Sequence, residues 1–160
     1  MRRLRVPRLT AALLCLGLAA CDSASGGYID ENRAELARWF GCDDYADAPL
    51  GGSVQGVLTD DDCHLLTATK YNVDHYVLEI SEQTMVEIEL DMGGGAQPVI
   101  ALRTTTNDNP GGSPRQTREA GGMGQVARMD YEYLPGVSVI SVTTLGAGET
   151  GPYTLSIRER

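Results

Sequence analysis

From residue 53 onward, hydrophobic and polar residues alternate along the chain with a period of two. The segment 84–90 shows this most clearly, because Val86, Ile88 and Leu90 alternate with two glutamates. Such alternation turns one set of side chains toward a core and the other toward water, which is typical of a β-strand. The same pattern predicts strands at residues 54–58, 73–80, 84–90, 99–105, 125–129, 137–143 and 153–157.

Turn residues separate these segments, and no helical pattern lies between them. Three consecutive glycines begin at Gly93, and Pro135 and Gly136 precede a later strand. Residues 81–83 are few enough to form a tight hairpin between the strands on either side. We therefore predict an all-β domain at residues 51–160, an antiparallel β-sandwich of seven or eight strands. Residues 106–124 lack periodicity and are predicted to be a loop.

A helical period precedes the strands, in the segment 29–40. Its apolar face has i, i+3, i+4 spacing and consists of Leu36, Trp39 and Phe40. We expect Asp30 as the N-cap and Gly41 just beyond the end of the helix. A helix of this length is marginal alone and must dock on another element. We expect a structural cap on the sandwich, and a binding helix is the alternative.

The first twenty residues have the pattern of a secretory signal peptide. Four arginines precede an apolar stretch at residues 9–20, which is too short for a comfortable transmembrane helix. The sequence Leu18-Ala19-Ala20-Cys21 resembles a bacterial lipobox, after which the mature chain begins with a lipid-modified cysteine. We expect a lipoprotein signal peptide at 1–20, acylation at Cys21, and a lipid-anchored linker with the short helix at 21–50. An ordinary signal peptide followed by a nearby cysteine is the alternative.

Lipidation would anchor the protein to a membrane without spanning it, because two or more acyl chains hold a protein stably on a bilayer. The expected location is the bacterial cell envelope, on its periplasmic or surface side. Of the four cysteines, Cys15 would leave with the signal peptide and Cys21 would carry lipid. In an oxidising compartment, the remaining Cys42 and Cys63 predict a disulfide. A metal site that also uses His64 is the alternative.

The chain is acidic, with 13 basic and 22 acidic residues and a formal net charge of −9. This charge argues against nucleic-acid binding, which requires a basic face. Removal of residues 1–20, which contain four arginines and no acid, would change −9 to −13. Two acidic clusters flank the predicted disulfide and are candidate Ca²⁺ ligands: Asp43, Asp44, Asp47, Asp60 and Asp62. Solvated acidic turns are the alternative.

Several segments, in order, resemble the bacterial pre-peptidase C-terminal domain. The matching motifs are Gly56-Val57-Leu58, Asp74-His75-Tyr76-Val77-Leu78, the segments 84–90 and 99–102, Pro135-Gly136 with the strand after it, and Gly151-Pro152-Tyr153-Thr154-Leu155. The resemblance covers residues 51–158. It implies a jelly-roll-like sandwich, of the kind that follows secreted proteases and also occurs in stand-alone lipoproteins. It also implies that Tyr76 and Tyr153 lie in the core.

The sequence contains no recognised catalytic motif, neither Gly-x-Ser-x-Gly nor His-Glu-x-x-His nor a P-loop. His75 is expected on the outer face of its strand beside Glu79, as a surface histidine. We therefore expect a non-catalytic binding or accessory module for an envelope protein or glycan. Tyr131 and Tyr133, two residues apart on one face, are candidates for stacking on a ligand. The alternatives are a purely structural envelope lipoprotein and a hydrolase, for example with His75 against a serine or threonine nucleophile.

Overall fold

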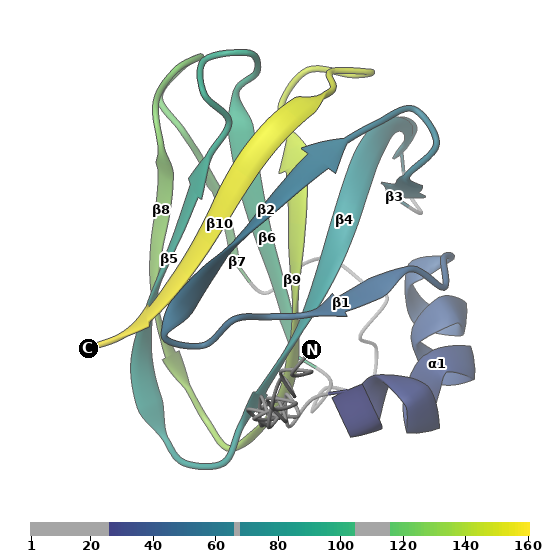
Figure 1. The fold of residues 1–160 in the computed structure, drawn as a ribbon, viewed down its shortest axis with the longest axis vertical. Coiled ribbons are helices and arrows are strands. Elements are labelled where there is room, and N and C mark those ends of the chain that lie inside the picture. Colours follow the sequence, from purple (N-terminus) through teal and green to yellow (C-terminus); the bar gives the residue numbers. More distant parts are fainter. Residues whose placement is uncertain (1–25, 66–67, 105–115) are drawn as a thin grey trace, which may run out of the picture.

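The computed structural model describes residues 26–65, 68–104 and 116–160 of the chain. Within them, two β-sheets face each other and one short helix precedes the strands (Figure 1). The predicted fold class, a β-sandwich with one N-terminal helix, is therefore confirmed. The predicted signal peptide and Cys21 lie outside the described residues. Among the described residues, no helix combines the length and hydrophobicity that a membrane span requires.

The helix α1 covers Gly26–Phe40, and ten strands follow it in the described residues. The strands are β1 (Tyr45–Asp47), β2 (Gly52–Leu58), β3 (Cys63–Leu65), β4 (Ala68–Ile80), β5 (Thr84–Asp91), β6 (Pro98–Thr104), β7 (Gln116–Glu119), β8 (Ala127–Tyr133), β9 (Gly136–Thr144) and β10 (Gly151–Glu159). Each predicted strand corresponds to one of them. The short strands β1, β3 and β7 are additional, and β7 lies within the segment 106–124 that the sequence predicts to be a loop.

The six-stranded sheet has the order β1-β4-β9-β6-β7, with β3 also paired to β4, and the four-stranded sheet has the order β2-β10-β5-β8. The described strand pairs are antiparallel except for β1 and β4, which run parallel from the pair Tyr45↔His75. The predicted hairpin at residues 81–83 is wrong. The strands β4 and β5 belong to different sheets, so these residues connect the two layers instead of closing a hairpin.

The main core lies between the two sheets. It buries Tyr76, Leu78 and Ile80 of β4 against inward residues of β5, including Ile88 and Leu90. Full burial of one such side chain contributes about 1.5–3 kcal/mol relative to exposure. The alternation seen in the sequence therefore identifies the inner face of each sheet.

A second, smaller core lies on the outer face of the six-stranded sheet, under α1. There Leu36 and Phe40 of the helix pack with Val77 of β4 and Val139 of β9. This arrangement makes α1 a cap on the sheet, as the sequence predicts. The helix ends as expected, because Gly41 has a φ of 76° and its N–H donates to the Ala37 carbonyl at 2.8 Å.

The beginning of α1 differs from the prediction. The helix starts at Gly26, so Asp30 lies inside it and is not the N-cap. The Asp30 carboxylate instead lies 3.6 Å from the Arg33 guanidinium, one turn further along the helix. Cys42, the second residue after the helix, forms the predicted disulfide with Cys63 at the start of β3. Their Cα atoms are 5.7 Å apart, so the bond joins the end of α1 to the six-stranded sheet.

Candidate functional site

His75 is not a surface histidine. It lies on the outer face of β4, as the sequence predicts. However, Phe40 and Tyr45 cover it, and only 3% of the residue is exposed. The Tyr45 ring stacks on the imidazole, with 5.5 Å between ring centroids. The prediction is wrong because alternation along a strand indicates only the face on which a side chain lies. It does not indicate whether another element packs against that face.

His75, Ser141 and Arg103 form a polar cluster beneath this aromatic cover. The Ser141 Oγ lies 2.9 Å from the His75 Nδ1 and accepts a hydrogen bond from the Arg103 Nη1 at 3.0 Å. Burial, with a smaller contribution from the Arg103 charge, lowers the pKa of His75 to about 3. The imidazole is therefore neutral near pH 7. Because Ser141 and His75 are both buried, a substrate has no access to this pair.

The structure corrects the expected stacking site at Tyr131 and Tyr133. Tyr133 is 1% exposed and belongs to the main core, and Tyr131 is half-buried against the same core. Their rings contact each other edge to face, with centroids 4.8 Å apart. Because Tyr133 is buried, the two tyrosines do not form an exposed pair of rings for a ligand.

The calcium candidates lie near the disulfide without converging on one point. The Asp62 carboxylate accepts hydrogen bonds from Thr59, at 2.5 Å from its N–H and 2.9 Å from its hydroxyl. Asp60 lies 3.4 Å from the Asn72 amide. Among the described residues, no three His, Cys, Asp or Glu side chains are grouped closely enough to hold a metal ion. The structure therefore does not bring Asp43, Asp44, Asp47, Asp60 and Asp62 together as one site.

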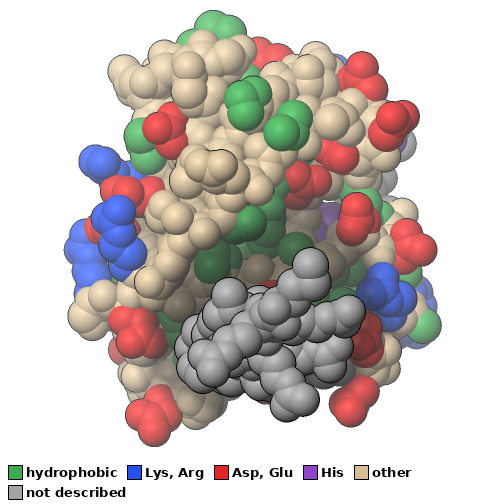
Figure 2. Space-filling view, in the orientation of Figure 1, with side chains coloured by type: hydrophobic (Ala, Val, Ile, Leu, Met, Phe, Trp, Pro, Cys, Tyr) green, Lys and Arg blue, Asp and Glu red, His purple; other side chains and the backbone are tan. Residues whose placement is uncertain are grey.

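Among the described residues, no helix lies over the outer face of the four-stranded sheet, which is the face toward the viewer in Figure 2. Part of it is a ladder of ion pairs across three strands, visible as blue and red side chains at the left of Figure 2. The Arg158 Nη1 of β10 lies 3.5 Å from both Glu87 and Glu89 of β5. The Arg128 Nε of β8 lies 2.6 Å from Glu89, and Arg160 pairs with Glu87 and Asp130. The charges in this part of the face are matched.

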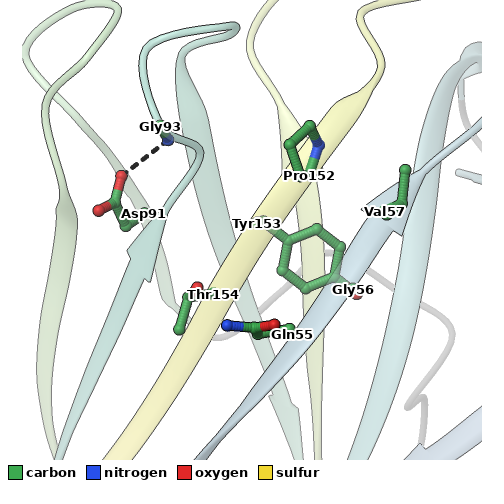
Figure 3. A pocket seen from close by; sticks show the side chains of 8 residues that line it. All are labelled: Gln55, Gly56, Val57, Asp91, Gly93, Pro152, Tyr153 and Thr154. Carbon is green, nitrogen blue, oxygen red and sulfur yellow. Dashed lines mark hydrogen bonds between the residues drawn. The ribbon is translucent and has the colours of Figure 1, made fainter.

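Beyond the ladder, the same face is hollowed by a groove with a volume of about 370 Å³ (Figure 3). It begins where the pairing of β5 with β10 ends, at the pair Thr154↔Asp91. After Asp91 the chain turns through Gly93 and Gly94, whose φ values of 59° and 91° suit glycine. Strand β10 extends further to Gly151, and the space beside it is the groove. This volume is within the usual range of ligand pockets, roughly 300–1,000 Å³.

The groove crosses three strands of the sheet. Val57 of β2 lies opposite Pro152 of β10, and Thr154 of β10 lies opposite Asp91 of β5. Gln55 completes the β2 side. Val57 is 56% exposed, and with the exposed Pro152 it gives the groove an apolar surface. The groove therefore combines an apolar surface with an amide, a hydroxyl and a carboxylate.

A hydrogen-bonded network supports the floor of the groove. The Tyr153 ring extends from β10 to Gly56 on β2, where any Cβ would collide with it (Figure 3). The Tyr153 hydroxyl donates to the Asp74 carboxylate and lies 2.6 Å from the Tyr76 hydroxyl. Three motifs noted in the sequence, Gly-x-Leu, Asp-x-Tyr and Gly-x-Tyr-x-Leu, thus meet at one point of the core.

Burial is the main cause that raises the pKa of Asp74 to about 6. The hydrogen bond from Tyr153 opposes this change, and the nearby charges of Asp62 and Asp44 add to it. Burial also raises the pKa of Tyr153 far above its ordinary value, so its hydroxyl remains a donor. The network therefore fixes the Tyr153 side chain under the groove.

The groove was not predicted from the sequence, although the sequence contains two of the motifs that form it. Val57 and Pro152 are the middle residues of Gly56-Val57-Leu58 and Gly151-Pro152-Tyr153, in which the side chains of Leu58 and Tyr153 are buried. Alternation therefore places both middle residues on the outer face. An apolar residue at an outward position is the signal that could have drawn attention to this site.

No protein-family model and no curated protein sequence matches this chain. Solved structures with a similar fold do exist. The pre-peptidase C-terminal domain of a Bacillus anthracis collagenase superposes with a TM-score of 0.54 and 16% identity, over 71% of this chain and 95% of that domain. The fold that the sequence resemblance implies is therefore confirmed.

Two further structures are less similar. The Aeromonas hydrophila periplasmic inhibitor of g-type lysozyme gives a TM-score of 0.47 at 15% identity, over 73% of this chain and 99% of its own. A family 35 carbohydrate-binding module of Cellvibrio japonicus Abf62 gives 0.37 at 16% identity, over 69% and 88% of the two chains. The fold is a β-sandwich similar to that of the pre-peptidase C-terminal domain.

Proposed function

We propose that this protein is a lipid-anchored extracytoplasmic lipoprotein whose sandwich is a non-catalytic module that binds an envelope protein or glycan. The observation that carries the proposal is the groove on the outer face of the four-stranded sheet. A module with a purely structural role has no need of a hollowed, partly apolar area on its exposed face. The buried His75 and Ser141 pair supports a role without catalysis, because a substrate cannot reach it.

The disulfide and the position of α1 support the cellular location. A Cys42–Cys63 bond is typical of proteins that fold in an oxidising compartment. In Figure 1, α1 lies at the lower end of the sandwich, and the turn that follows β5 and borders the groove lies at the upper end. A tether attached to α1 would therefore join the sandwich at the end opposite to this turn.

Fractionation of cells tests the anchor. Wild-type protein should sediment with membranes, and the Cys21→Ala variant should be released, because it cannot carry the acyl chains. A Cys15→Ala variant alters the expected signal peptide without removing the lipid site and is the matched control. Retention of Cys21→Ala on membranes would contradict the lipid anchor.

Photocrosslinking in intact cells tests the groove. A photoreactive amino acid at Val57 should capture a discrete partner, because this side chain lines the groove. The same group at Ser156 should capture much less, because this residue lies on the outer face of the same sheet but outside the groove. Equal capture from the two positions, or capture from neither, would favour the purely structural alternative.

A further inference from the structure

The outer face of the four-stranded sheet is electrostatically uneven. Glu87, Glu89 and Asp130 are all paired with arginines in the ladder. Asp91 follows on the same strand and the same face, but no ion pair joins it to another described residue. Its Oδ1 accepts the Gly93 N–H at 2.8 Å, and the residue lines the groove. The groove thus has a negative charge that this face does not neutralise.

The distance across the groove suits a long side chain with a charged end. Strands in a sheet lie about 4.8 Å apart, so Asp91 on β5 and Val57 on β2 are separated by two such spacings, with β10 between them. Pro152 and Thr154 of β10 lie along this path. Lysine and arginine pack their aliphatic stems on apolar surface while the charged group stays at a polar edge.

We infer that the groove holds a lysine or arginine side chain of a cationic protein partner, with its charge at Asp91 and its stem on Val57 and Pro152. This inference rests on the proposed function and specifies its ligand. Gln55 and Thr154 provide neutral hydrogen-bonding groups for the partner's main chain beside that side chain. The residues that line the groove include no lysine, arginine or histidine, so a ligand with a negative charge has no counter-charge there.

The charge of the whole chain supports a cationic partner. The formal net charge is −9, and Asp60 and Asp61 follow Val57 closely in the turn after β2. A negative surface attracts a positively charged protein over long distances and increases its association rate. A short-range contact at Asp91 would then add specificity to this general attraction.

Titration of the full chain in detergent micelles with a peptide of alternating lysine and valine tests the inference. Chemical shifts of the Gly93 and Thr154 amides should change on binding, and the affinity should fall as salt is added. Asp91→Asn should weaken binding roughly tenfold, because a charged hydrogen bond is lost. The asparagine still accepts the Gly93 N–H, so the turn should persist. Asp130→Asn removes the same charge from the same face outside the groove and should change the affinity less than about twofold.

The other outcomes separate this inference from the proposed function. Equal weakening by Asp91→Asn and Asp130→Asn would overturn the inference, because it would show attraction by overall charge alone. Binding of an oligomer of N-acetylglucosamine at the same amides, without binding of the peptide, would also overturn it and leave a glycan-binding module. If neither probe binds, the cationic side chain is excluded, and the crosslinks from Val57 then decide whether the groove binds another ligand.

Discussion

The two outer faces of the sandwich differ in what covers them. On the six-stranded sheet, the outward residues of β4 and β9 include Val77 and Val139, and α1 packs over them. On the four-stranded sheet, the outward residues of β5 and β10 include Glu87, Glu89 and Arg158, and no described element covers them. A strand with apolar side chains on both of its faces is buried on both sides. A strand in which apolar and polar side chains alternate has one face in water. The second face is therefore the one available to a partner.

Polar groups on the two faces also have different consequences. On the covered face, His75 and Ser141 are buried, and their hydrogen bond offsets part of the cost of losing water, while the His75 Nε2 has no hydrogen-bond partner among the described residues. On the open face, the ladder of ion pairs remains in contact with solvent, where such pairs contribute little to stability. We therefore expect substitutions on the covered face to affect folding and substitutions on the open face to affect binding.

The largest effect should come from Phe40→Ala at the end of α1. Phe40 is almost fully buried between His75, Tyr45 and Arg103. Truncation of a buried phenylalanine costs about 3–5 kcal/mol of unfolding free energy. Urea denaturation should show this loss, and Met85→Ala on the open face should stay within about 0.5 kcal/mol of wild type. Equal losses for both variants would remove the distinction between the two faces.

Alternation in the sequence was sufficient to locate the seven longer strands, although it missed the short strands β1, β3 and β7. The strand 84–90 and the segment around Tyr131 obey the same rule, since Asp130 and Glu132 on either side of Tyr131 lie outward and both tyrosines lie inward. Consistent use of that rule would have placed the tyrosines in the core. The cover over His75 and the groove at Val57 could not be predicted in this way. Each depends on which strands pair and on where a helix docks, and neither is a local property of sequence.

A smaller effect, with a defined pH dependence, is expected for Asp74→Asn beneath the groove. Because the folded-state pKa of Asp74 is raised to about 6, its protonated form favours folding. Its stabilising contribution is fully present below the unfolded pKa of about 4 and is lost as the pH rises through 6.

At pH 7 the Asn variant should therefore be more stable than wild type. We expect a gain of about 1 kcal/mol, because the carboxyl is only half-buried and solvent screens its charge. The gain should disappear toward pH 4 in urea titrations at several pH values. Asp61→Asn removes an exposed charge from the turn after β2 and is the control, with a change of at most about 0.5 kcal/mol. A difference between Asp74→Asn and wild type that is constant across pH 4 to 7 would contradict the assigned titration.

The smallest effect is expected for Arg158→Ala in the ladder of ion pairs. The guanidinium contacts Glu87 and Glu89 at 3.5 Å, yet 60% of the Arg158 side chain is exposed. Exposed pairs of this kind contribute about 0.2–1 kcal/mol, and added salt reduces that contribution further. Thermal unfolding at low and high salt should show a small loss that shrinks as salt increases. A loss as large as that of Phe40→Ala would mean that the ladder supports the fold as strongly as α1 does, and the open face could no longer be treated as a surface free to serve binding.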